Sequence, residues 1–197
     1  MKISHLLSGL ALTALVSGTA LAQAPAAPAG SAPPGQPEVK TIGDWAVRCY
    51  PMQSASPCDM FQQQNDAKSQ QRILALSIAY IPHLDRHAIQ ISVPLGVAVR
   101  PGVIIHTGTF SSPAMPYRRC DRGGCYVEML IDNATVDQLS HGGDNAMVKI
   151  TADDGKNYDL KISLNGFAAA HDQMAELAKQ KAKAPPPAAA APAAPGK

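Results

Sequence analysis

Four cysteines are the residues of this 197-residue chain with the most definite chemistry, and their even number indicates disulfide bonds in an exported protein. Three pairings are open. We favour the local pairs, Cys49 with Cys58 and Cys120 with Cys125, because two glycines in 120-CDRGGC-125 let that loop fold back. Each local bond would contribute roughly 2–3 kcal/mol, although a long-range bond such as Cys49 to Cys120 would contribute about 4 kcal/mol. Neither spacing is the C-x-x-C of a redox enzyme, and paired zinc ligands are lacking.

Arginine and tyrosine gather around the second cysteine pair, as Tyr117, Arg118, Arg119, Arg122 and Tyr126. Both residue types are enriched at interaction sites, and a rigid loop presents them at low entropic cost. We therefore predict an interaction loop for a partner or an anion. A solvated basic loop without a ligand is the alternative.

The histidines offer weaker chemistry. His83 and His87 are four residues apart, a spacing that ligates metal when it falls on a helix. Here they follow Pro82 in a charged segment after a strand, so we expect solvent-exposed loop histidines. The others are isolated from any recognisable nucleophile: His106, His141 and His171. The sequence predicts no metal site.

Signatures of catalysis are missing from the sequence. It has no G-x-S-x-G elbow, its Gly142-Gly143 turn lacks a Walker lysine, and its carboxylates are scattered. We therefore predict no catalytic residue, no cofactor and no enzymatic activity. The chain has 17 basic and 15 acidic residues, a near balance that argues against nucleic-acid binding.

The N-terminus has the pattern of a secretory signal peptide. Lys2 precedes an apolar run from Leu6 to Val16, and 20-ALA-22 forms an A-x-A cleavage site. The run is shorter than the roughly 18 residues that a membrane-spanning helix needs. We predict that residues 1–22 are a signal peptide cleaved after Ala22, which places the mature chain in the periplasm or outside the cell, not spanning the membrane.

Two segments rich in alanine and proline flank the middle of the mature chain, at 23–37 and 184–197. Such segments bury too little apolar surface to offset the entropy of ordering, so we expect disordered spacers. They serve either as tethers or as solubilising ends. The remaining residues, 38–183, have the length of one domain.

Alternating polar and apolar residues dominate this domain. Residues 157–164 and 89–93 each present one apolar and one polar face, which is the pattern of a half-buried strand. Residues 74–81 are apolar on both faces and predict a central strand. Asp154-Gly155 indicates a tight hairpin between strands at 146–151 and 157–164.

Helical spacing appears near the C-terminus, after Gly166, in Phe167, Ala170, Met174, Leu177 and Ala178. This helix should pack on the sheet, with partner binding as the alternative, and residues 133–139 predict a second, short helix. We predict a mainly β fold, a small antiparallel β-sandwich of immunoglobulin-like type with a C-terminal α-helix.

Several motifs in this order resemble the invasion-associated locus B family: 45-WAVRC-49, Cys58, 94-PLGVAVRPGV-103, the Cys120–Cys125 segment and 163-SLNGFAAA-170. The resemblance runs from about Gly43 to Leu177. It implies export by a Gram-negative bacterium and a β-sandwich fold, and the family name records a link to entry into host cells. It supplies no reaction, cofactor or catalytic residue.

Two functions remain open. The first is a non-catalytic interaction or structural module of the cell envelope, acting on an unidentified envelope or extracellular protein. The second is a periplasmic enzyme or small-ligand-binding protein whose site is assembled only in three dimensions. A cleft with two or more titratable groups of perturbed pKa would favour the second. An exposed apolar patch rimmed by arginine and tyrosine would favour the first.

Overall fold

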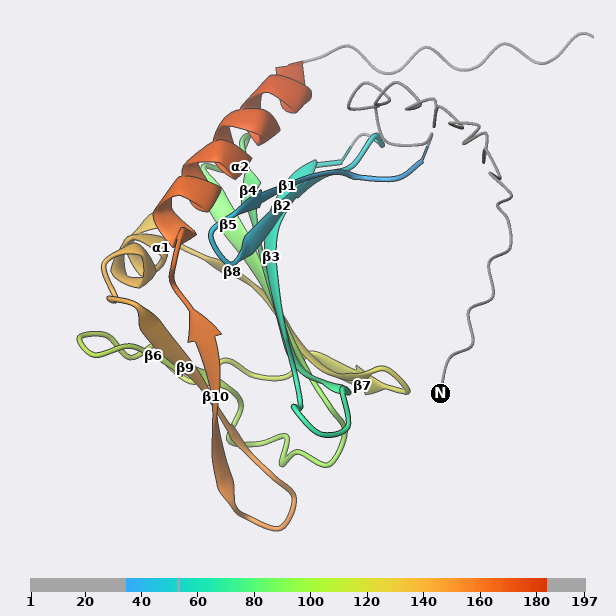
Figure 1. Ribbon diagram of the computed structural model, residues 1–197, viewed down its shortest axis with the longest axis vertical. Coiled ribbons are helices and arrows are strands. Elements are labelled where there is room, and N and C mark those ends of the chain that lie inside the picture. The colour runs from blue at the N-terminus through green and yellow to red at the C-terminus, as the bar shows by residue number, and fades with distance from the viewer. Residues whose placement is uncertain (1–34, 53, 184–197) are drawn as a thin grey trace, which may run out of the picture. The chain divides into compact units, whose positions relative to one another are not determined.

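The computed structural model describes residues 35–52 and 54–183 (Figure 1). The predicted signal peptide, most of the N-terminal spacer and the C-terminal tail therefore lie outside the described residues. The described residues belong to one compact unit, which packs around a single apolar core. None of the described helices is long and apolar enough to cross a membrane.

Ten strands of the described residues form two antiparallel sheets. The larger sheet has seven strands, in the order β1 (Glu38–Ile42), β2 (Trp45–Cys49), β3 (Cys58–Asn65), β4 (Arg72–Ile81), β5 (Arg86–Val93), β8 (Gly124–Ile131) and β7 (Arg119–Asp121). The smaller sheet has three strands, in the order β10 (Asn157–Ser163), β9 (Asn145–Thr151) and β6 (Ile104–His106).

The strand expected at the centre lies at the centre. β4 is the fourth of the seven strands, and its Leu74, Leu76 and Ile78 are fully buried on the inner face of the sheet. Between them, Ala75 and Ser77 point to the outer face, because side chains alternate along a strand. The bulky face of β4 thus builds the core, and its small face builds a shallow floor on the other side of the sheet.

Two helices share the second layer with the smaller sheet. Both α1 (Asn133–Ser140) and α2 (Phe167–Lys183) lie on the same side of the large sheet as the three-stranded sheet (Figure 1). α2 packs across β2, β3 and β4. Its Phe167 ring meets Trp45 edge-on with the centroids 5.3 Å apart. The mainly β, antiparallel fold with a C-terminal helix is confirmed, and helices occupy part of the layer facing the seven strands.

Two glycines fix where α2 begins. Gly43, in the β1–β2 turn, and Gly166, just before α2, both have positive φ, and a Cβ added to either would lie 2.9 Å from the Cα of the other. A Cβ on Gly43 would collide with the carbonyl of Asn165, and one on Gly166 would lie 2.7 Å from the carbonyl oxygen of Ile42. The close backbone approach therefore requires glycine at both positions.

A buried amide joins the two sheets. Gln62 on β3 donates to the carbonyl of Ser163 on β10 at 3.1 Å and accepts from its backbone N–H at 2.9 Å. Trp45 donates its indole N–H to the same carbonyl at 3.1 Å. Paired hydrogen bonds of this kind fix the position of the small sheet relative to the large one.

Both disulfides link neighbouring strands. Cys49 on β2 is bonded to Cys58 on β3, and Cys120 on β7 is bonded to Cys125 on β8. Each pair is directly opposed in the strand register. This is the local pairing favoured from the sequence. The hairpin predicted around Asp154-Gly155 is likewise present, between β9 and β10.

Candidate functional site

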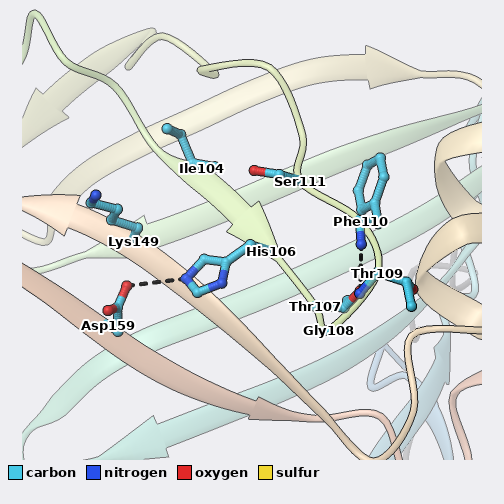
Figure 2. Close-up of a pocket in the computed structure, with 9 residues that line it drawn as sticks. All are labelled: Ile104, His106, Thr107, Gly108, Thr109, Phe110, Ser111, Lys149 and Asp159. Atoms are coloured by element: carbon cyan, nitrogen blue, oxygen red, sulfur yellow. Dashed lines mark hydrogen bonds and ion pairs between the residues drawn. The ribbon is translucent and has the colours of Figure 1, made fainter.

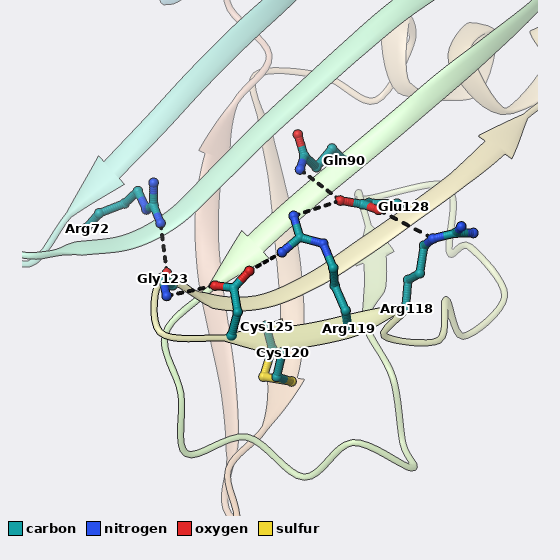
Figure 3. Close-up of polar contacts among 9 residues, drawn as sticks. Arg72, Gln90, Arg118, Arg119, Cys120, Gly123, Cys125 and Glu128 are labelled. Carbon is teal, nitrogen blue, oxygen red and sulfur yellow. Dashed lines mark hydrogen bonds and ion pairs between the residues drawn. A yellow bond between two sulfur atoms is a disulfide. The ribbon is translucent and has the colours of Figure 1, made fainter.

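The predicted interaction loop is a tight hairpin at the edge of the large sheet, made by β7 and β8 and stapled by the Cys120–Cys125 bond (Figure 3). Gly124 has φ +134°, and a Cβ there would collide with the carbonyl of Val93 on β5. Arg72 at the start of β4 donates to the carbonyl of Gly123 at 3.1 Å. We call residues 117–126 the arginine hairpin.

Two of the three arginines are paired within the protein. Arg119 forms ion pairs with Asp121 and with Glu128, the latter at 3.1 Å (Figure 3). Its guanidinium lies 3.9 Å from the Tyr126 ring centroid. Arg118 also reaches Glu128, with its Nε 3.5 Å from Oε2. Arg122 forms no ion pair within the described residues. The hairpin is therefore less positive than its sequence indicates.

The two tyrosines differ in position. Tyr126 lies under Arg119 on the outer face, whereas Tyr117 packs against the core. The Tyr117 hydroxyl is buried without a hydrogen-bond partner in the described part of the chain, and burial raises the pKa of Tyr117 to about 12. The hairpin thus brings the arginines and Tyr126 to one surface, while Tyr117 supports that surface from beneath.

A shallow hollow of about 590 Å³ lies beside the arginine hairpin on the outer face of the large sheet. Its floor consists of small side chains of β4 and β5, including Ser77, Ala79 and Ala88. Leu130 of β8 lies at the edge of the hollow and is 41 % exposed. The other lining residues are Tyr50, Ser56, Asp59, Ile89, Gln90, Arg118, Glu128 and Met129. We call this the sheet-face hollow.

The opposite rim of the sheet-face hollow is a second arginine–carboxylate pair. Arg48 on β2 donates from Nε to Asp59 on β3 at 2.9 Å, and its guanidinium lies 3.9 Å from the Phe61 ring centroid. Ser77 donates to the same carboxylate at 2.6 Å. The two hydrogen bonds to Asp59 hold Arg48 in a fixed orientation, and the hollow has charged groups on both sides of an apolar and small-residue floor.

A second hollow, of about 550 Å³, lies on the smaller sheet around His106 (Figure 2). Nε2 of His106 is 3.1 Å from Oδ1 of Asp159, which is the partnership that orients a general base. Thr107 accepts the backbone N–H of Phe110 at 3.1 Å and so holds the turn. No serine or threonine hydroxyl of residues 35–52 and 54–183 is hydrogen-bonded to this histidine.

A third hollow, of about 490 Å³, lies between α1, α2 and the β4–β5 turn. At the base of this hollow lies His87 on β5, which is 3 % exposed. Its Nε2 is 2.9 Å from Nε2 of His171 on α2. Nδ1 of His171 is 3.1 Å from Oδ1 of Asp172. We call this the histidine cleft.

Two groups of the histidine cleft have perturbed pKa values. Burial, followed by repulsion from His171, lowers the pKa of His87 from 6.5 to about 4. The Tyr80 hydroxyl donates to Asp85 at 2.7 Å, and this hydrogen bond, followed by burial, raises the pKa of Tyr80. This is the combination that we expected of a ligand-binding site assembled in three dimensions.

The prediction that His87 is a solvent-exposed loop residue is wrong. The turn after Pro82 is short, so β5 already begins at Arg86 and His87 points inward with Ile89 and Ile91. His83 is exposed in the turn, as predicted. The alternation of His87 with the two isoleucines was the signal in the sequence. Nothing local could have revealed its partner, 84 residues later in the chain.

Comparisons with known proteins agree with this architecture. The family model of the invasion-associated locus B protein matches residues 45–175, which include the arginine hairpin and both cleft histidines. Invasion protein B homologues from two strains of Brucella abortus are each 25 % identical over 140 residues, covering 71 % of this chain and 80 % of the relative.

A solved structure supports the fold independently. The crystal structure of invasion-associated protein B from Bartonella henselae superposes with a TM-score of 0.63 at 23 % identity. The superposition covers 72 % of this chain and 99 % of the Bartonella chain. At 23 % sequence identity, this similarity shows a shared fold and nothing further.

Proposed function

Because this chain belongs to the invasion-associated locus B family, we propose that it is an exported cell-envelope protein that acts as a non-catalytic interaction module. It works in the periplasm or at the cell surface and binds another envelope or extracellular protein. The names of the Brucella and Bartonella proteins suggest host-cell association as one setting for this interaction.

The sheet-face hollow is the observation that carries the proposal. Both helices and the small sheet lie on the inner face of the large sheet, so no described element packs on the middle of the outer face (Figure 1). An exposed leucine and a floor of small residues lie there between two arginine–carboxylate pairs. Protein interfaces combine such an apolar centre with a polar rim that contains arginine.

Export is supported by the cysteines and by the N-terminal pattern. Disulfides persist in oxidising compartments, and both pairs of the described chain are bonded. Osmotic-shock fractionation of cells that express the full chain, followed by intact-mass measurement, tests this part. We expect a periplasmic or secreted protein that lacks residues 1–22 and carries no free thiol. A cytoplasmic protein of full length would contradict export.

Partner binding is tested by cross-linking in intact cells, recovery from the envelope fraction and mass spectrometry. The variant Leu130→Ser with Arg118→Ser alters the sheet-face hollow without touching the core. Leu95→Ser with Lys156→Ser is the matched control, because Leu95 is 58 % exposed and the Lys156 side chain 72 % exposed, both outside the hollow. We expect a reproducible partner that the first variant loses and the control retains.

The opposite results are equally informative. Recovery of this protein alone would count against an interaction module. A partner retained by both variants would place the interaction elsewhere on the surface and remove the sheet-face hollow from the proposal.

A further inference from the structure

The histidine cleft presents two imidazole nitrogens to each other. Nε2 of His87 and Nε2 of His171 are 2.9 Å apart, and they come from β5 and α2. Nδ1 of His171 lies 3.1 Å from a carboxylate oxygen of Asp172 and donates its proton there. That bond leaves Nε2 of His171 with a lone pair directed at His87. Histidines that bind metals are commonly oriented in this way, by a carboxylate on the other ring nitrogen.

The contact between His87 and His171 is unfavourable if it serves only to hold the fold together. Since His171 accepts at Nε2, His87 donates at Nε2 and is left with a bare acceptor at Nδ1. This Nδ1 is buried and has no hydrogen-bond partner within the described residues. Apolar side chains would fill the same place without that cost. The His87–His171 contact is therefore costly for folding, and stability alone does not account for two histidines at this place.

The distances suit a metal ion shared by the two rings. Two imidazole nitrogens that each lie about 2.0–2.1 Å from a tetrahedral Zn²⁺ are about 3.3 Å apart. The observed 2.9 Å therefore has to widen by less than roughly half an ångström. His171 can make this movement because its side chain is 23 % exposed on the wall of a cleft of about 490 Å³.

We propose that His87 and His171 form a binding site for a divalent transition-metal ion that prefers imidazole, with Zn²⁺ as the representative. Within the described residues no three histidine, cysteine or acidic side chains converge on one point, so the protein supplies two ligands. Water or an exogenous ligand takes the remaining positions, as in zinc sites that keep an open position. Three carboxylates line the cleft, those of Asp85, Asp137 and Asp172, against the single lysine Lys179, and this excess of acidic groups favours a cation over an anion.

Titration of Zn²⁺ by isothermal calorimetry tests the site directly. The protein is the full mature chain, prepared without an affinity tag and stripped with a chelator. We expect one Zn²⁺ ion to bind with a micromolar Kd, and the melting temperature to rise as the Zn²⁺ concentration increases. His171→Gln should weaken binding by at least about tenfold, because it removes one of the two protein ligands, and loss of an outer-shell partner alone commonly costs 10- to 100-fold in affinity.

His106→Gln is the control, since His106 is also paired with a carboxylate but lies on the other sheet. It should bind Zn²⁺ like the unaltered chain. His87→Gln gives a second test from the buried side, and His171→Gln decides the question if that variant does not fold. Absence of Zn²⁺ binding at 0.1 mM, or equal loss in the His171 and His106 variants, would overturn the proposal.

Discussion

The arginine hairpin and the histidine cleft lie on opposite faces of the same sheet and are held together differently. The hairpin is continuous in sequence, closed by one disulfide, and its Arg118 and Arg119 are paired with carboxylates. The histidine cleft draws side chains from β4, β5, α1 and α2, and it contains a buried nitrogen that has no hydrogen-bond partner in the described part of the chain.

The hairpin presents side chains from one continuous segment, whereas the cleft forms only when separate elements pack together. Arg118 and Arg119 find their partners close by in the sequence, at Asp121 and Glu128, so the surface of the hairpin needs only the sheet edge beneath it. The cleft exists only while α2 stays on the sheet, because His171 comes from that helix. We therefore expect changes to α2 and to pH to act on the cleft, and changes to the cysteines and arginines to act on the hairpin.

Detaching α2 gives the largest expected effect. Phe167 is 1 % exposed and packs edge-on against Trp45 at the start of the helix. Phe167→Ala should lower the free energy of unfolding by about 3–5 kcal/mol, because it removes a large buried ring and leaves a cavity. Urea unfolding measures this, with the exposed Leu95→Ala as a control that should change little. A loss below about 1 kcal/mol would show that α2 does not depend on this contact.

Acid should weaken the cleft before it affects the hairpin. The folded pKa of His87 is about 4 and its usual value is 6.5, so between these values the unfolded chain binds more protons. Stability contributed by neutral His87 is thus complete above pH 6.5 and is lost as the pH falls to about 4, by up to about 3 kcal/mol.

Urea unfolding at pH 7 and pH 4.5, in buffer with a chelator, measures this loss. His87→Gln should be less sensitive to pH over the same interval, since it cannot be protonated. Equal pH dependence in both proteins would exclude His87 as the cause.

Opening the disulfide of the hairpin should have a smaller effect. The Cys120–Cys125 bond closes a loop with a sequence separation of 5, which in the chain-entropy model is worth about 2 kcal/mol. The double variant Cys120→Ser, Cys125→Ser should lose that amount in urea unfolding and retain the pH dependence of the cleft. The Cys49–Cys58 bond closes a longer loop and its removal should cost slightly more. A hairpin variant that also lost the pH dependence would show that the two regions are coupled.

The sequence predicts the hairpin better than the cleft for a physical reason. The glycines, the cysteine spacing and the period-two alternation of 74–81 are local signals, and the structure has the corresponding turn, bonded pair and central strand. The cleft depends on a contact between residues 84 positions apart, which no local pattern encodes. The helix around Met174 was predictable from its spacing, but the strand end that His171 meets was not.

Removing a charge from the hairpin should have the smallest effect on stability. The same change tests whether Arg118 serves folding or partner binding. The Arg118 side chain is 70 % exposed and shares Glu128 with Arg119, so Arg118→Ser should change the free energy of unfolding by less than about 0.5 kcal/mol. Thermal melts at low salt and in 1 M salt measure this, and any difference should disappear at high salt because surface pairs are screened. Arg118→Lys keeps the charge and serves as the control. A large loss of stability would mean that Arg118 holds the hairpin together, and its loss could then not separate partner binding from folding.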